Sequence, residues 1–474
     1  MKRYLWILLC MLTSWVTAAP VATPSDSIDN LTKESSYNPS VQFAVPQKPI
    51  HDAYKSKVFM NSEEFLQHPD LLKNALDTAI LRENTSVVRF LLPLYDRLPE
   101  NQRDKTLGEY AHAIVASADG QYAQAEQQLR ALLVQNPEYA PVRLQLARVL
   151  AKDGQLRDAA KEIDTLKQTP DMPNETTQYL EQFDHYLVKE QAWKFNANTY
   201  YIQDDNVGRV PQQRQYGYWR FSEPKSAHGV GYDLSAQKNM SLKGHWATRV
   251  NVSTSGKFYW DAHDYDDLQT HAEVGTIWRN AKREISVSPF YERRWYGSKP
   301  YSHNAGGVLR YSEILSPKWQ VWGAWQSAYK KHDKRQFLDG ANHAGSVTLV
   351  YAPDPKQYFV MGGGSGYQAA KDKSEAYSQT NARVGWHRQW KNTFDLTTDF
   401  NFLVQSRHYQ APDFFNIKRR DKEYMTRVSV SSPKFSWKGF EPRLNWTWSR
   451  INSNHFYYRY KNHRVFIDVS KQFK

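Results

Sequence analysis

The sequence predicts an α+β multidomain fold, in which an N-terminal α-helical tetratricopeptide-repeat domain is followed by a 14-stranded antiparallel transmembrane β-barrel. From residue 191 to residue 474, apolar and polar residues alternate through segment after segment, which is the period of a β-strand with two unlike faces. From residue 56 to residue 190, apolar residues recur at helical spacing and one pattern returns after 34 residues. The two periods predict two domains that meet near residue 190.

Two further segments precede these domains. Residues 1–19 predict a secretory signal peptide, because Lys2 and Arg3 precede an apolar stretch that ends in small residues. Residues 20–55 are rich in Pro, Ser, Asn and Thr, a composition that is typical of a flexible segment. The alternative is that this segment acts as a plug or as an arm that contacts a client. The single cysteine, Cys10, lies in the signal peptide, so the mature chain is expected to have no disulfide and no cysteine metal site.

Residues 113–170 contain two copies of the 34-residue pattern. The copies share small residues where two helices cross, a glycine at the turn and a proline after the second helix. The residues assigned to these packing positions are Ala113, Gly120, Tyr122, Ala125, Pro137, Ala147, Gly154 and Ala159. A degenerate copy without the glycine is predicted at 72–105, and a helix at 177–188 is predicted to lead into the first strand. Stacked repeats present a concave surface, so we expect a protein-binding platform, with shielding of the barrel mouth as the alternative.

The 14 predicted strands have short connections after the even-numbered strands and mostly longer ones after the odd-numbered strands. They cover residues 192–202, 229–240, 244–259, 267–279, 283–296, 303–314, 318–330, 341–352, 356–369, 376–390, 392–408, 420–432, 437–451 and 457–473. The short connections include 241–243, 280–281, 352–355 and 431–433, and the longer ones include 203–228, 260–266, 331–340 and 409–419. In outer-membrane barrels short turns face the periplasm and long loops face outside. We therefore expect both barrel ends in the periplasm, where the helical domain can attach.

Aromatic content and charge agree with this location. All 14 tryptophans beyond the signal peptide lie in the strand region, which favours a membrane barrel with aromatic girdles over a soluble β-sandwich or propeller. Residues 191–474 carry 42 Lys and Arg against 24 Asp and Glu, whereas residues 19–190 carry 18 against 25. We interpret the basic loops as facing the anionic outer leaflet, and we expect no nucleic-acid partner in a secreted chain. The acidic helical domain favours a client with exposed basic groups.

The sequence contains no recognisable catalytic constellation, so no enzyme activity, metal or cofactor is predicted. It has no His-Glu-x-x-His pattern, and its glycine-rich segment 361–367 lies in a predicted strand without the spacing of a nucleophile turn. Asp204, Asp205 and Asn206 follow the first strand directly. They predict either a turn closed by their own side-chain hydrogen bonds or a contact with a client or a cation.

The combination of a leader, a small tetratricopeptide domain and a 14-stranded barrel resembles the surface lipoprotein assembly modulator family, the Slam or type XI secretion proteins. The resemblance covers nearly the whole mature chain and includes the segment Asp204-Asp205-Asn206-Val207, which looks like a family motif. The chain departs from the usual barrel ending, because Lys474 follows the aromatic Phe473.

This resemblance implies an outer-membrane translocator with its N-terminal domain in the periplasm. Its client would be a lipoprotein or a related secreted protein, such as one that acquires haem or iron, and its other partners would be outer-membrane lipids and the barrel assembly machinery. The client would follow a polar path through the barrel or a lateral edge between the first and last strands. An exopolysaccharide export barrel, a passive porin and an outer-membrane enzyme are the alternatives.

Overall fold

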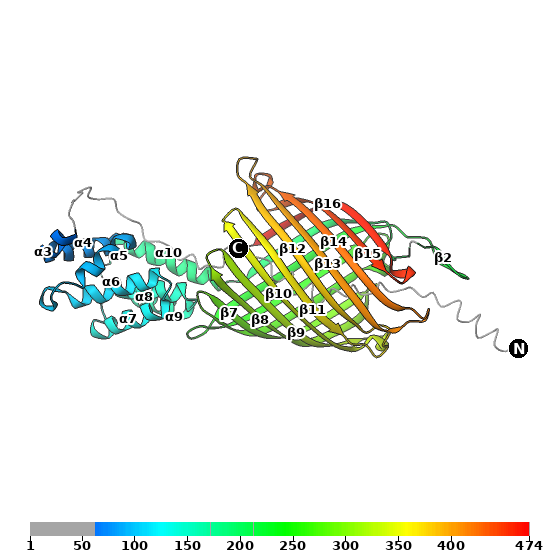
Figure 1. The fold of residues 1–474 in the computed structure, drawn as a ribbon, viewed down its shortest axis with the longest axis horizontal. Coiled ribbons are helices and arrows are strands. Elements are labelled where there is room, and N and C mark those ends of the chain that lie inside the picture. The colour runs from blue at the N-terminus through cyan, green and yellow to red at the C-terminus, as the bar shows by residue number, and fades with distance from the viewer. Residues whose placement is uncertain (1–61, 171, 212, 474) are drawn as a thin grey trace.

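The computed structural model describes residues 62–170, 172–211 and 213–473. The expected signal peptide, 1–19, and the expected flexible segment, 20–55, therefore lie outside the described residues. A helical array lies at one end of a long β-barrel, and the C-terminus lies at that same end (Figure 1). The order of elements, helices first and a closed barrel after them, confirms the predicted fold class.

Successive helices of the array pack against one another in sequence order. They are α3 (Ser62–Gln67), α4 (Pro69–Leu81), α5 (Thr85–Tyr95), α6 (Lys105–Ala118), α7 (Tyr122–Gln135), α8 (Ala140–Lys152), α9 (Leu156–Lys167) and α10 (Asn174–Glu190). Side chains that accept a first-turn N–H set two of the helix starts, Asn84 before α5 and Asp104 before α6. Among the described helices, none has the length and apolar character needed to cross a bilayer.

The pairs α6–α7 and α8–α9 coincide with the two predicted repeats. Gly120 and Gly154 connect the helices of each pair with φ of +72° and +80°, a conformation that a residue with a Cβ adopts at a cost. In the α4–α5 pair, where no glycine was found, Glu83 takes the corresponding left-handed conformation with φ of 53°. The helix predicted at 177–188 is α10, which is followed by the first strand from Lys194.

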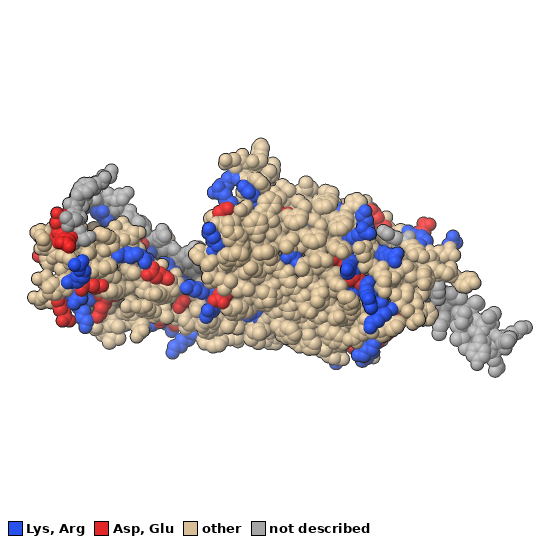
Figure 2. All heavy atoms as spheres, viewed as in Figure 1, with Lys and Arg blue, Asp and Glu red and all other residues tan. Residues whose placement is uncertain are grey.

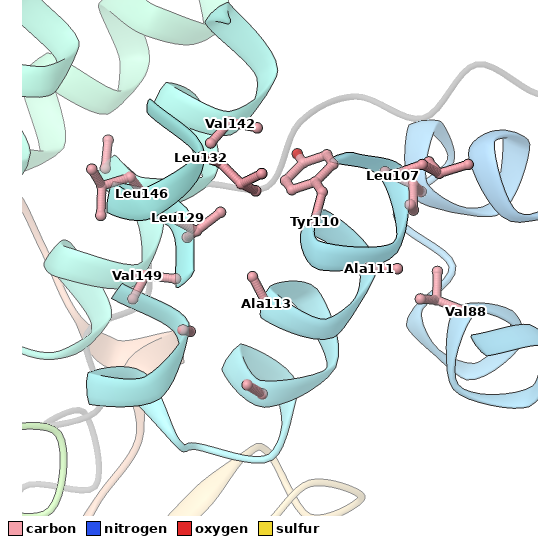
Figure 3. Packing of buried hydrophobic residues seen from close by; sticks show 14 of the residues in the cluster. Val88, Leu107, Tyr110, Ala111, Ala113, Leu129, Leu132, Val142, Leu146 and Val149 are labelled. Carbon is pink, nitrogen blue, oxygen red and sulfur yellow. The ribbon is translucent and has the colours of Figure 1, made fainter. Parts of the chain in front are cut away.

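One apolar core runs through the array. Figure 3 shows Tyr110 and Ala113 of α6 turned toward Leu129 and Leu132 of α7. The four alanines assigned to helix crossings, Ala113, Ala125, Ala147 and Ala159, have no exposed surface. Tyr122 is half-buried against this core, and Pro137 is exposed just after α7.

Fourteen antiparallel strands close into the barrel. They are β1 (Lys194–Asp204), β4 (Ala227–Ser241), β5 (Trp246–Tyr259), β6 (Asp267–Arg279), β7 (Arg283–Tyr296), β8 (Lys299–Ser316), β9 (Trp319–His332), β10 (Gly340–Asp354), β11 (Gln357–Gln368), β12 (Tyr377–Trp390), β13 (Leu396–Pro412), β14 (Lys418–Ser431), β15 (Glu441–Ser453) and β16 (Tyr460–Phe473). The first connection also contains a small hairpin of β2 (Gln215–Tyr216) and β3 (Trp219–Arg220), which was not predicted.

The predicted alternation separates an apolar outer face from a polar interior. On β6, Glu273 is 4% exposed and the next residue, Val274, is 53% exposed. Exposed apolar side chains of this kind include Leu234, Trp246, Leu309, Val347, Val384, Leu444 and Val465. On the face of the barrel that Figure 2 shows, charged residues gather toward the two ends, with a band between them that is nearly free of charge. This is the distribution that a strand-built membrane protein requires.

Two connections differ from the predicted pattern of short and long. The connection between β7 and β8 consists of Gly297 and Ser298 alone, with φ of 55° and 60°, which is a tight hairpin turn. Pairing therefore starts at Lys299 and not near residue 303 as predicted. Conversely, the connection 432–440 at the helical end is long, because it contains a 3₁₀ turn and the isolated bridge between Trp437 and Phe440.

The alanine at the crossing of α7 gives a test of repeat packing. We expect Ala125→Leu to destabilise the helical array by about 1–3 kcal/mol, because a larger side chain must displace close-packed neighbours. Ala123→Leu on the exposed side of the same helix is the matched control and should change little. Thermal unfolding of the full chain followed by the helical circular dichroism signal would measure both. Equal unfolding temperatures would contradict close packing at Ala125.

Candidate functional site

Carboxylates of the helical array accept backbone N–H groups from two turns of the barrel. Asp158 on α9 accepts from Gly244 N at 2.7 Å, and Gly244 lies in the turn between β4 and β5. Asp153, at the end of α8, accepts from Ala281 N at 3.0 Å, in the turn between β6 and β7. The second repeat is therefore attached to one side of the barrel rim.

Two further contacts strengthen this attachment. Gln191, which follows α10, accepts from Ser241 N at 3.2 Å through its side-chain oxygen. The imidazole of His245 lies 3.7 Å from the second oxygen of Asp153. The junction thus extends from the tip of the second repeat to the start of the first strand, and it holds the array over the rim at β4–β7 (Figure 1).

Comparison of the two repeats shows what is particular to this tip. Asp119 lies 34 residues before Asp153 and also stands beside a turn glycine. It forms an ion pair of 2.6 Å with Arg89 inside the array. The same repeat position is therefore used for internal packing in the first copy and for attachment to the barrel in the second.

Burial and hydrogen bonds affect the two attaching carboxylates differently. Burial alone would raise the pKa of Asp158, but the N–H of Gly244 and the ammonium of Lys161 outweigh it and hold this pKa below its ordinary value. Burial is also the largest effect on Asp153, and there it raises the pKa above the ordinary value, because the N–H of Ala281 and the nearby His245 offset it only in part. Asp158 is accordingly the carboxylate whose charge favours the attached state.

The inner wall of the barrel carries buried ion pairs and amide contacts. Glu273 on β6 binds Arg310 on β8 at 2.9 Å and also lies 3.5 Å from His271. A second group joins three strands, because Asn445 donates to Asp468 at 2.7 Å and accepts from Arg427 at 2.7 Å. Charged and amide groups that satisfy one another give the interior a polar lining.

The predicted Asp204-Asp205-Asn206 segment forms a turn at the end of β1. Asp204 accepts from Asn206 N at 3.2 Å, and the side chain of Asn206 both donates to and accepts from the backbone of Val210. Asp205 is exposed. Asp204 also binds Arg464 of β16 at 2.7 Å, with the two side chains 14% and 28% exposed. An ion pair of this exposure contributes about 0–1 kcal/mol.

That ion pair crosses the seam between the first and last strands, where the ladder is short. β1 pairs with β4 along its whole length, from Lys194 to Asp204. With β16 it pairs only from Phe195 to Tyr200 among the described residues. We call Tyr201–Asp204 of β1 and Tyr460–Ile467 of β16 the outer half of the seam.

An aromatic cluster closes the end of the outer half. Tyr216 of the β2–β3 hairpin stacks on Phe456, with ring centroids 3.9 Å apart and an interplanar angle of 10°. Phe221 packs against Tyr457 at 5.5 Å. The connection after β1 therefore reaches over to the connection before β16, and side chains join the two strands where backbone pairing does not.

Known proteins resemble this chain over both domains. The family described as surface lipoprotein assembly modifier matches residues 193–473, and its N-terminal tetratricopeptide repeats match residues 58–163. The chain belongs to the surface lipoprotein assembly modifier family. It is 31% identical over 427 residues to surface lipoprotein assembly modifier 1 of Haemophilus influenzae, which covers 88% of each chain.

Other members of the family are similar along their length as well. Surface lipoprotein assembly modifier 1 of Neisseria meningitidis is 30% identical over 88% of this chain and 86% of its own. The hemophilin secretion modulator of Acinetobacter baumannii is 24% identical over 88% of this chain and 89% of its own. The family is one of assembly and secretion modifiers, and within the described residues no group of three or more His, Cys, Asp or Glu side chains is arranged to hold a metal.

Sequence reasoning selected the repeat turns and the segment after β1 but missed their partners. Asp153 and Asp158 surround the predicted turn glycine, and nothing local marks them as contacts to the barrel. Arg464 lies 260 residues after Asp204, so the ion pair between them could not be found from spacing. The signal that could have drawn attention to Asp153 is its equivalence to Asp119, because the two aspartates occupy the same position in successive repeats.

The attachment of the array can be tested by removing its two carboxylates. We expect Asp153→Ala combined with Asp158→Ala to broaden the distance distribution between spin labels on Val134→Cys and Phe435→Cys, because two backbone N–H groups of the rim lose their acceptors. Electron–electron double resonance measures this distribution. Asp119→Ala, the equivalent position in the first repeat, should leave it unchanged. The same width in both variants would contradict attachment through the second repeat.

The depressed pKa of Asp158 predicts the pH dependence of attachment. Its charged form is favoured in the attached state, so its contribution is complete above the ordinary Asp pKa of about 3.9 and is lost as pH falls through the lower attached value. In an Asp153→Asn background, the label distribution should stay constant from neutral pH to about pH 4 and broaden below it. Adding Asp158→Asn should abolish that transition. Broadening already near neutral pH would contradict the prediction.

Proposed function

We propose that this chain is an outer-membrane translocator that delivers lipoproteins or related secreted proteins to the cell surface, with its helical domain in the periplasm. The observation that carries the proposal is the attachment of a tetratricopeptide array to the rim of a polar-lined barrel. Relatives named for lipoprotein assembly and for hemophilin secretion support a protein as the cargo.

The periplasmic placement is supported by topology. The even number of strands brings the start of β1 and the end of β16 to one rim, where Phe195 pairs with Phe473. The helical array lies at this rim (Figure 1). Most connections at the opposite rim are longer, as on the outside of barrel proteins.

In this proposal the array holds a partly unfolded client beside the barrel, and its acidic balance favours clients with exposed basic groups. Asp205 is exposed at the end of β1 and is a candidate client contact. Folding of the client outside would give the transport its direction. Outer-membrane lipids and, during biogenesis, the barrel assembly machinery are proposed as further partners.

Membership of an assembly-modifier family favours protein delivery over exopolysaccharide export or a passive pore. The same membership supports a role without catalysis. No contact in the described part of the chain favours one of the alternatives over transport of a protein.

Surface delivery can be measured on a lipoprotein that is encoded beside this chain's gene and carries an epitope tag, called here the tagged client. We expect protease and antibody accessibility of the tagged client on intact cells to fall to background when this chain is absent. Deleting 51–188 while keeping the barrel should abolish delivery as well. Equal accessibility without the chain would refute the translocator proposal, and delivery by the truncated chain would refute only the platform role of the array.

A further inference from the structure

In the outer half of the seam, one edge of β16 is not paired with any described strand. β16 pairs with β15 from Tyr460 to Ser470, but among the described residues it pairs with β1 only from Asp468 onward. In an antiparallel sheet, backbone N–H and C=O groups point alternately to the two sides of a strand. From Tyr460 to Ile467, one side of β16 therefore has main-chain groups that no described strand pairs with.

This edge lies beside the apolar outer surface of the barrel. Val465 and Ile467, both within the edge, are 67% and 58% exposed. Unpaired main-chain groups are costly in apolar surroundings, and a free edge is a template for another strand. The edge is longer than the common strand length of about 5–6 residues. It can therefore take a complete added strand.

Among the described residues, side-chain contacts alone hold the outer half closed. The ring of Tyr200 lies over Gly231, where a Cβ would collide with it, and its centroid is 5.6 Å from that of Phe466. The Asp204–Arg464 ion pair and the aromatic cluster complete the closure. All of these contacts can separate without breaking any strand pairing, so the outer half can part while the paired half stays joined.

We infer that the edge Tyr460–Ile467 of β16 binds an extended segment of the client, which adds to the barrel as a temporary strand on its way to the surface. The inference rests on the proposed function and assigns the exit to the outer half of the seam. Strand addition uses main-chain hydrogen bonds and tolerates varied side chains. That tolerance suits a family whose members are named for different cargo.

Two disulfide tethers test where the seam opens. Continuing the register of the paired half by two residues places Ile202 opposite Phe466, so Ile202→Cys with Phe466→Cys closes the outer half. Asn198→Cys with Ser470→Cys closes the half that is already paired and is the matched control. Cys10 is the only native cysteine, so the introduced thiols have few competing partners.

We expect the oxidised outer tether to reduce accessibility of the tagged client to the level of cells lacking the chain, with recovery after reduction. The oxidised control tether should leave accessibility at the level of the unaltered chain. Delivery through an oxidised outer tether would overturn the inference, and loss with both tethers would overturn its restriction to the outer half. Failure of the unaltered chain to deliver the tagged client would instead contradict the proposed function.

Photo-crosslinking tests the contact directly and does not depend on disulfide formation. Benzoylphenylalanine at Val465 should form an adduct with the tagged client, whereas the same group at Val347 on β10, which is 59% exposed, should not. Equal adducts at both positions, or none at either, would overturn the inference. An adduct of Val465 with residues 1–61 of the chain itself would also overturn it, because the chain's own N-terminal segment would then occupy the edge.

Discussion

The structure depends on one constraint, which is that every main-chain N–H and C=O group at membrane depth must find a hydrogen-bond partner inside the protein. A closed antiparallel ladder meets this requirement, and 14 strands provide it here. The alternation of apolar and polar residues follows from the same closure, because each strand has one face toward lipid and one toward the interior. Among the described strands, the seam between β1 and β16 has the fewest main-chain partners, since their pairing stops at Tyr200. That makes it the part of the wall that can change most easily.

The junction between the domains also supplies hydrogen-bond partners for main-chain groups, in this case at the rim of the barrel. Turns leave N–H groups unpaired, and Asp158 and Asp153 accept two of them from Gly244 and Ala281. A repeat protein stacks its units in one dimension, so the tip of each repeat is free to contact something else. In this chain the second tip contacts the barrel, so the array is held at a defined place beside the mouth. A client bound there would be presented to the barrel and not merely kept near it.

The two features give a consistent account of transport within the surface lipoprotein assembly modifier family. The array is attached at β4–β7, while the less paired seam lies between β1 and β16, and β1 is the neighbour of β4 in the barrel wall. The attachment relies on charge-assisted hydrogen bonds, whereas the outer seam relies on rings and one partly exposed ion pair. The attachment of the array is thus on the side where a client would arrive, and the side-chain contacts of the outer seam lie toward the opposite rim.

The sequence by itself determined the fold class, the number of strands and the repeat turns, because periods of two and of 34 residues are local properties of a chain. Strand ends were predicted within a few residues, and differences of four residues occur at the starts of β8, β13 and β15 and at the end of β13. At β8 the reason is that Gly297 and Ser298 form a tight turn whose left-handed backbone had not been recognised. The attachment of Asp153 and Asp158 to the rim, and the ion pair between Asp204 and Arg464, were decided only by the tertiary structure. Each joins residues that are far apart in sequence, and barrel closure alone brings the first strand beside the last. How far their pairing extends depends on register and on packing around Tyr200, which no local pattern encodes.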